Sequence, residues 1–153
     1  MNAGGELADK AAAEIKVELL PVIDGVKLNP DEAYRLSVSG KLIKIEAVTE
    51  RGVYWALQTL RQLEKKKGKK SLFAGCEIVD WPAFRIRGFM QDVGRSYISV
   101  EELKREIEIL SRFKSMCFIG HLTENQAWRL ESKIFPMLND SINTVVCRVS
   151  TIH

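Results

Sequence analysis

The stretch that decides the fold is Asp80-Trp-Pro-Ala-Phe-Arg-Ile-Arg-Gly-Phe-Met-Gln-Asp-Val-Gly-Arg95, with a second motif at His121-Leu-Thr-Glu-Asn-Gln-Ala-Trp-Arg129. Within the first motif, residues 87–92 predict a β-strand that ends at polar side chains. Residues 116–122 form a second apolar run, of the kind found in buried parallel strands. We therefore expect two parallel strands, each ending at a polar group.

A helix is expected between these two strands. Ser99 is a suitable N-cap, and Glu102 three residues later completes the pattern of a capping box. The apolar residues that recur at helical spacing predict its buried stripe: Leu103, Ile107, Leu110 and Phe113. A further helical stretch is expected from Asn125. Strand, helix, strand and helix form the repeating unit of a βα barrel.

In a βα barrel the loops after the carboxyl ends of the strands build the active site, which places residues 92–95 and 121–124 on the functional face. Arg95 is either one half of a structural ion pair with Asp92 or a donor to two adjacent sugar hydroxyls, which its planar guanidinium suits. His121 and Glu124 could hydrogen-bond a polar ligand or each other. An isolated histidine, however, is more often structural than catalytic.

Aromatic and acidic residues elsewhere have simpler interpretations. Trp81 and Trp128 could stack on a sugar face, but tryptophan beside an apolar stripe usually belongs to a core. The dipeptide Asp31-Glu32 follows Asn29-Pro30 and precedes a strand. Turn chemistry explains it, and we assign it no catalytic role.

The region before the first motif has the pattern of a sheet with one packed helix. Strands are predicted at 15–20, 34–38 and 42–47, with a tight turn at 39–41 where Gly40 supplies the required conformation. Thr49 is a plausible N-cap for an amphipathic helix. Its apolar face is Val53, Ala56, Leu57, Leu60 and Leu63. Core packing alone explains this pattern, so we interpret the region as a scaffold.

The chain therefore divides into an α+β domain at 1–75, the first βαβ portion of an incomplete TIM-type barrel at 76–143, and a tail at 144–153. The fold class is α/β. Composition agrees with a globular protein, since 46% of the 153 residues are hydrophobic and 28% are charged. No stretch reaches the length of a membrane span, and Met1 to Lys10 have no apolar segment of the export type.

Charge and cysteine usage exclude several classes of function. The net charge is +3, and five of the lysines form the cluster Lys65-Lys-Lys-Gly-Lys-Lys70. No aromatic residue interleaves with this cluster, so we expect a solvated loop and no nucleic-acid partner. The three cysteines, Cys76, Cys117 and Cys147, have no CxxC spacing and predict neither a disulfide framework nor a zinc site. No metal or cofactor is expected.

Taken together, the two motifs resemble the start of the catalytic barrel of glycoside hydrolase family 20, the β-N-acetylhexosaminidases. The segment Asp80-Trp-Pro with Arg87-Gly88, Asp92 and Arg95 is similar to the family's first barrel strand. His121-Leu-Thr-Glu-Asn-Gln-Ala-Trp-Arg129 is similar to the end of the second. The region before them, including Thr49-Glu-Arg-Gly52 and Leu60-Arg-Gln-Leu63, resembles the small α/β domain that precedes the barrel.

This resemblance implies an activity and a substrate. Family members hydrolyse terminal non-reducing N-acetylhexosamine from glycans by a retaining, substrate-assisted mechanism, in which the sugar's own acetamido oxygen attacks the anomeric carbon. By the resemblance, Arg95 grips sugar hydroxyls while His121 and Glu124 shape the same pocket. The family's Asp-Glu catalytic pair follows a later strand. Nothing in this chain corresponds to it, so no catalytic residue is assigned.

Two departures from the family pattern accompany the missing pair. Ile119 and Gly120 stand where a histidine and a tryptophan are usual, and the tail Thr144-Val-Val-Cys-Arg-Val-Ser-Thr-Ile-His153 resembles nothing in the family. We therefore expect a truncated hexosaminidase that is inactive alone. The alternatives are a carbohydrate-binding module that uses Arg95 and Glu124, and an assembly module that associates through the open barrel edge. The family is commonly exported or lysosomal, but the sequence assigns no compartment, sugar preference or linkage.

Overall fold

The computed structural model describes residues 7–9 and 13–139. The chain folds as two compact units, Met1–Arg85 (unit 1) and Ile86–His153 (unit 2). Neither of the α-helices in the described ranges has the length and apolar character needed to cross a membrane.

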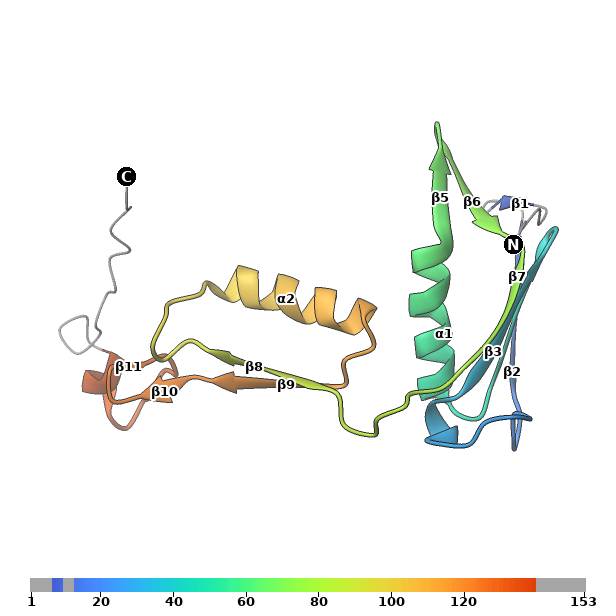
Figure 1. The fold of residues 1–153 in the computed structure, drawn as a ribbon. Coiled ribbons are helices and arrows are strands. Elements are labelled where there is room, and N and C mark those ends of the chain that lie inside the picture. Colours follow the sequence, from blue (N-terminus) through green and yellow to red (C-terminus); the bar gives the residue numbers. More distant parts are fainter. Residues whose placement is uncertain (1–6, 10–12, 140–153) are drawn as a thin grey trace, which may run out of the picture. The chain divides into compact units, whose positions relative to one another are not determined.

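Unit 1 is built on a four-stranded sheet (Figure 1). Its strands, in spatial order, are β2 (Glu14–Leu19), β4 (Leu42–Ala47), β3 (Tyr34–Ser39) and β7 (Cys76–Asp80). β2 runs parallel to β4, whereas β3 is antiparallel to both of its neighbours. Gly40, at φ 50°, closes the turn of the central β3–β4 hairpin. The three strands and the turn predicted from the sequence for this region are confirmed.

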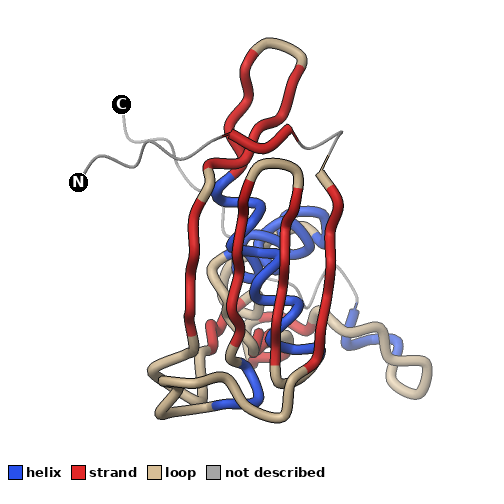
Figure 2. Tube along the Cα trace, turned by 90° about the vertical axis from the view of Figure 1, so that its right-hand side faces the viewer, coloured by secondary structure: helices blue, strands red, loops and turns tan. Residues whose placement is uncertain are grey.

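Helix α1 (Glu50–Leu63) lies behind this sheet in Figure 2 and closes the core of unit 1. Thr49 caps it by accepting a hydrogen bond from the backbone N–H of Arg51 at 3.2 Å. The buried core consists of Tyr34, Leu36, Val38, Ile43, Ile45, Ala47, Trp55, Ala56, Leu60 and Phe73. The predicted helix face is wrong at Leu57, which is 37% exposed. Trp55 takes the buried position instead, because its indole N–H donates to the buried Glu32 carboxylate at 2.6 Å.

The Asp31-Glu32 dipeptide belongs to a short turn, as the sequence predicts. It lies in η1 (Pro30–Glu32), a single 3₁₀ turn preceded by Asn29 at φ 46°. Glu32 is 4% exposed and accepts the Trp55 bond, while Asp31 pairs with Arg51 at 3.5 Å. Both carboxylates therefore have structural partners.

The lysine cluster is not the loop that its sequence predicts. Residues Glu64–Lys67 form β5 and Lys70–Ala74 form β6, an antiparallel hairpin that turns at Gly68, φ 62°. β6 also pairs with β1 (Leu7–Asp9). Polar and apolar residues do not alternate in the lysine cluster, so its sequence does not predict a strand. Pairing with β6, in which Phe73 lies opposite Glu64 and Leu72 opposite Lys65, supplies the order instead.

Unit 1 also continues past the predicted boundary at residue 75. β7 pairs with β3 along its whole length, with Asp80 opposite Tyr34. The Tyr34 hydroxyl donates to the Asp80 carboxylate at 2.9 Å and lies 2.6 Å from the Thr59 hydroxyl. Residues 76–80 therefore belong to the sheet of unit 1, which ends at Arg85.

Unit 2 begins with a βαβ arrangement: β8 (Gly88–Asp92), α2 (Val100–Arg112) and β9 (Cys117–His121), with the two strands parallel. The predicted capping box is confirmed, since Ser99 and Glu102 each bind the other's backbone N–H. The predicted buried stripe is wrong. No side chain of α2, all of which the structure describes, is buried, and Phe113 is 76% exposed.

The helix predicted from Asn125 is also wrong. Thr123–Glu124 (β10) and Ala127–Trp128 (β11) pair as a tight hairpin around Asn125 and Gln126, and a 3₁₀ turn η2 (Pro136–Asn139) follows. The Glu124 carboxylate accepts the backbone N–H of Asn125 at 3.0 Å, which favours a turn over the first turn of a helix. The predicted aberrant tail, 144–153, lies outside the described residues.

Candidate functional site

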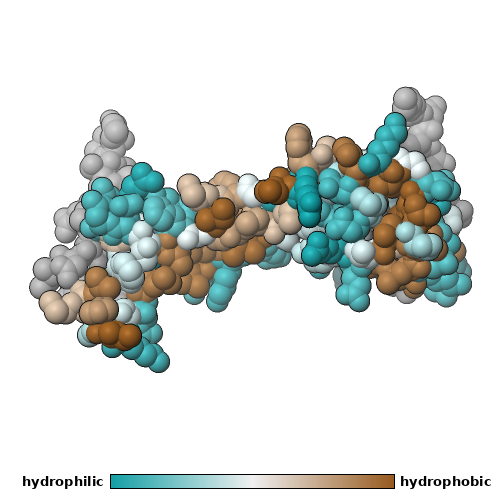
Figure 3. All heavy atoms as spheres, turned by 90° about the horizontal axis from the view of Figure 1, so that it is seen from below, coloured by the Kyte–Doolittle hydropathy of each residue, from teal (hydrophilic) through white to brown (hydrophobic). Residues whose placement is uncertain are grey.

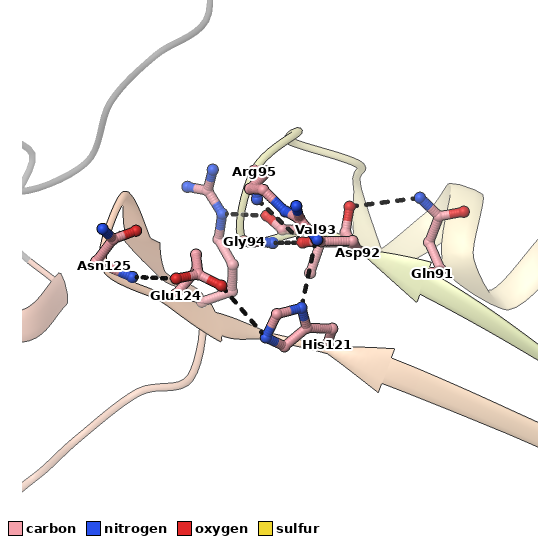
Figure 4. Close-up of polar contacts among 9 residues, drawn as sticks. Gln91, Asp92, Val93, Gly94, Arg95, His121, Glu124 and Asn125 are labelled. Carbon is pink, nitrogen blue, oxygen red and sulfur yellow. Dashed lines mark hydrogen bonds and ion pairs between the residues drawn. The ribbon is translucent and has the colours of Figure 1, made fainter.

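Two parallel strands bring their carboxyl ends together in unit 2. β8 and β9 are in register, so that Asp92 and His121, their last residues, lie side by side. The chain then leaves both strands at the same edge, with Arg95 in the turn after β8 and Glu124 in the short strand β10 after β9 (Figure 4). Four chemically active side chains from two segments of the chain thus converge on one place.

Asp92 is at the centre of this cluster. One of its carboxylate oxygens accepts the backbone N–H groups of Gly94 at 3.0 Å and Arg95 at 3.1 Å. The other accepts the Nε–H of the Arg95 guanidinium. The backbone bond from Arg95, assisted by the guanidinium and by His121, lowers the pKa of Asp92 to about 2. Asp92 is therefore a fixed anion that holds Arg95.

His121 lies between two carboxylates. Its Nδ1 is 3.3 Å from an oxygen of Asp92 and its Nε2 is 3.7 Å from an oxygen of Glu124. The His121 and Glu124 side chains are 37% and 32% exposed, so both reach solvent while held on one side by protein. The imidazole therefore connects the last residue of β8, Asp92, with Glu124, which follows β9.

Close backbone contacts fix the two loops. The carbonyl of His121 accepts the backbone N–H groups of Val93 at 3.1 Å and Gly94 at 3.2 Å. A Cβ atom at Gly94 would lie 2.8 Å from the Cβ of Glu124, so only glycine fits without displacing that residue. Arg129 reinforces the arrangement by donating from Nε to the Val93 carbonyl at 2.9 Å. The site is thus assembled by its backbone as much as by its side chains.

The side chains of this cluster are suited to binding a polar ligand. Arg95 is 61% exposed, and guanidinium, imidazole and carboxylate groups are suitable partners for hydroxyl groups. Beside the cluster is a pocket of about 500 Å³ lined by Thr123, Glu124, Asn125, Ala127, Trp128 and Leu138. Arg95 and His121 do not line it. Within residues 7–9 and 13–139, no group of histidine, cysteine and carboxylate side chains has the arrangement of a metal site.

The structure brings the three predicted site residues Arg95, His121 and Glu124 together, and it adds a fourth. The sequence places Asp92 on the functional face but assigns it only a pairing with Arg95. In the structure it contacts both Arg95 and His121 and orders the turn at residues 92–95. The sequence feature that could have predicted this role is the spacing of Asp92 and Gly94. An aspartate two residues before a glycine often accepts a hydrogen bond from the backbone of its own turn. Of the two tryptophans considered, Trp128 lines the pocket, whereas Trp81 belongs to unit 1.

Comparison with known proteins gives a family for both units. Residues 2–81 match glycosyl hydrolase family 20, domain 2, and residues 84–145 match the catalytic domain of the same family. A β-hexosaminidase of Porphyromonas gingivalis is 40% identical over 117 residues, which are 72% of this chain and 15% of that protein. A β-hexosaminidase of Vibrio furnissii is 36% identical over 132 residues, covering 86% and 21% respectively.

Solved structures agree with the sequence comparisons. An exo-β-N-acetylglucosaminidase of family 20 from Vibrio harveyi, solved in complex with N-acetylglucosamine, superposes with a TM-score of 0.71 at 38% identity. The match covers 81% of this chain and 19% of that one. This chain thus spans about a fifth or less of the length of these relatives. Because the family match extends over both units and over more than half of the chain, the chain belongs to glycosyl hydrolase family 20.

Proposed function

We propose that this chain is a substrate-binding part of a β-N-acetylhexosaminidase. Such an enzyme hydrolyses terminal non-reducing N-acetylhexosamine residues of glycans. The observation that carries the proposal is the convergence of Arg95, His121 and Glu124 around Asp92. A rigid set of donors and acceptors at the carboxyl ends of adjacent parallel strands is suited to binding a sugar. The Vibrio harveyi relative, solved with N-acetylglucosamine, supports the choice of ligand.

We further propose that β8, α2 and β9 are the first part of a (β/α)₈ barrel. Phe89 lines a groove with residues of α2 and stacks with Phe118 of β9, so these two side chains face the helix. Because side chains alternate along a strand, Asp92 and His121 project from the opposite face, together with Met90 and Ile119. In a barrel this opposite face is the interior, where substrate contacts lie.

Each site residue then has a role. Arg95, oriented by Asp92, donates to sugar hydroxyls, while His121 and Glu124 shape the adjoining wall. Hydrolysis by the family's mechanism needs an acid and a group that orients the acetamido oxygen. The chain has one Asp-Glu dipeptide, Asp31-Glu32, and its carboxylates are engaged in unit 1. We therefore propose that the 153-residue chain binds the sugar but does not hydrolyse it.

The activity claim is tested with chromogenic N-acetylglucosaminide and N-acetylgalactosaminide substrates. The pure chain should release no aglycone above the uncatalysed rate, because general acid catalysis alone supplies about 10² to 10⁴ in rate. Robust release would overturn the claim that catalytic groups are missing. A full-length family relative in the same assay serves as the positive control.

The binding claim is tested by titrating N-acetylglucosamine into labelled chain and following amide NMR signals of unit 2. We expect saturable shifts at millimolar sugar around the strand ends, weakened at least about tenfold in Arg95→Ala because charge-assisted hydrogen bonds are lost. Arg105→Ala is the matched control, since Arg105 is an exposed arginine of α2 outside the cluster. Absence of any saturable shift in the unaltered chain would remove the binding function.

A second function, assembly through the open barrel edge, is favoured by one observation. Met90 and Ile119 are 57% and 54% exposed on neighbouring strands, and Figure 3, which views the strands from the side away from α2, shows hydrophobic surface over them. Among the described residues, β8 and β9 pair only with each other. Such a sheet invites further strands from another polypeptide. Strictly monomeric sedimentation across a wide concentration range would count against assembly.

A further inference from the structure

The β5–β6 hairpin concentrates positive charge that the proposed glycosidase function does not use. Residues 65–70 hold five lysines, a larger charge than the net +3 of the whole chain. We propose that this hairpin binds an acidic polysaccharide, whose carboxylate or sulfate groups pair with the lysine ammonium groups. The hairpin projects past the end of the four-stranded sheet of unit 1 in Figures 1 and 2, where a long polymer can reach it.

The geometry of the hairpin arranges the charges as a ladder. Lys67 and Lys70 are directly opposite each other across the antiparallel pair, and Lys65 lies two residues along the same strand as Lys67. Side chains two apart in a strand share a face and are separated by roughly 7 Å. Lys65, Lys67 and Lys70 therefore present three ammonium groups on one face, and Lys69 adds another beside the Gly68 turn.

Four lysines of the hairpin lack, within the described part of the chain, the ion-pair partners that other lysines of unit 1 have. Lys44 pairs with Glu46 at 2.7 Å and Lys16 with Glu14 at 3.5 Å. In contrast, Lys65, Lys66, Lys67 and Lys69 are exposed and form no ion pair with any described residue. Like charges opposite each other weaken an antiparallel pair, so the hairpin tip carries an unfavourable charge arrangement. A bound polyanion relieves that repulsion.

The side chains of the hairpin favour a polysaccharide over other polyanions. Residues 65–71 contain no aromatic side chain on which a base could stack and no apolar side chain that could enter a bilayer. A row of point charges on an extended strand matches a linear polymer with regularly spaced anions. The choice of a glycan rests on the proposed function, because a glycan-cleaving family has reason to remain on an acidic glycan. The excess of positive charge on the hairpin is an observation from the sequence and does not depend on the proposed function.

The test uses the full 153-residue chain and a fluorescent heparin oligosaccharide, with binding followed by anisotropy over a range of salt. The variant replaces Lys65, Lys67 and Lys70 by Gln. The matched control replaces Lys27, Lys41 and Lys104 by Gln, exposed lysines that give the same change in net charge. We expect the hairpin variant to bind about tenfold or more weakly and its salt slope to fall by about two to three. The control should stay within about threefold of the unaltered chain.

Two results would overturn the proposal. Equal weakening in both triple variants would show that only net charge matters. Tighter binding of duplex DNA or of phosphatidylserine vesicles than of the oligosaccharide would assign the hairpin to another class of partner. The N-acetylglucosamine titration of unit 2 is read separately, so loss of sugar binding at Arg95 and loss of polyanion binding at the hairpin are distinguishable failures.

Discussion

Unit 1 and unit 2 are stabilised in different ways. In unit 1, Leu36 and Ile45 are fully buried between a four-stranded sheet and α1. In unit 2, the helix α2 buries none of its side chains, and the buried apolar residues Val93 and Ala127 lie next to the polar cluster. Unit 1 therefore has a closed apolar core, whereas the described part of unit 2 has an ordered polar edge but exposed apolar faces. A well-ordered polar cluster does not require a closed apolar core beneath it.

The largest expected effect tests the core of unit 1. Ile43 is 1% exposed in β4, and its partner in the parallel register, Ile15 of β2, is 53% exposed. Ile43→Ala should lower the free energy of unfolding of unit 1 by about 3–4 kcal/mol, because it removes buried methyl groups and leaves a cavity. Ile15→Ala should cost less than about 1 kcal/mol. Hydrogen exchange of the β3 and β4 amides, measured in the full chain, reports both values.

Unit 2 supplies the third member of this series. Ile119→Ala removes a side chain that is 54% exposed in β9, and its cost should resemble that of Ile15→Ala. A cost near that of Ile43→Ala would show that Ile119 is covered in solution, by a second copy of the chain for example. In that event the contrast between the two units would disappear.

A smaller effect is expected at the start of α2. Ser99→Ala removes both the hydroxyl that accepts the Glu102 N–H at 3.2 Å and the bond from that hydroxyl to the Glu102 carboxylate. The helix should lose about 1 kcal/mol, seen as faster exchange in its first turn. Ser96→Ala, in the exposed loop before the cap, is the control and should leave exchange of α2 unchanged. Equal exchange in both variants would contradict a stabilising role for the cap.

The smallest expected effect concerns pH and the polar edge. The pKa of Asp92 falls from 3.8 to about 2 on folding, so its contribution to stability is fully present above about pH 4 and is lost as the pH falls through 2. Carbon-13 titration of the Asp92 carboxyl should show this low value. In Arg95→Ala the pKa should rise only in part, because the backbone N–H of residue 95 remains. A carboxyl that titrates near 3.8 in the unaltered chain would contradict the network.

Much of the fold was predictable where local signals are strong. Alternation of apolar residues located β3 and β4, Thr49 and Ser99 marked both helix starts, and two apolar runs located β8 and β9. The candidate site followed from one physical rule. Parallel strands end at a common edge. Residues at the end of a strand, such as His121, and residues shortly after one, such as Arg95 and Glu124, are therefore expected to meet there.

The errors arise where tertiary contacts override local pattern. Trp55 displaced Leu57 from the buried face because a buried carboxylate, Glu32, lies within reach of its indole. The apolar residues of α2 recur at helical spacing, which predicts a buried face. Periodicity does not show whether the structure contains another apolar surface that packs against this face. β7 was placed beyond the domain boundary because its partner β3 is distant in sequence. Pairing between two strands that are distant in the sequence cannot be predicted from the sequence of either strand alone.

The central place of the β3–β4 hairpin in the sheet of unit 1 has a consequence for the order of folding. Hairpin and α1 are consecutive in the chain, so their contacts close only short loops and form early. β2 and β7 occupy the two outer positions and must be recruited from more distant parts of the sequence. We therefore expect a nucleus between Tyr34 and Leu63, with the rim of the sheet added last. During synthesis, we expect this nucleus to form before the polar edge of unit 2 has left the ribosome.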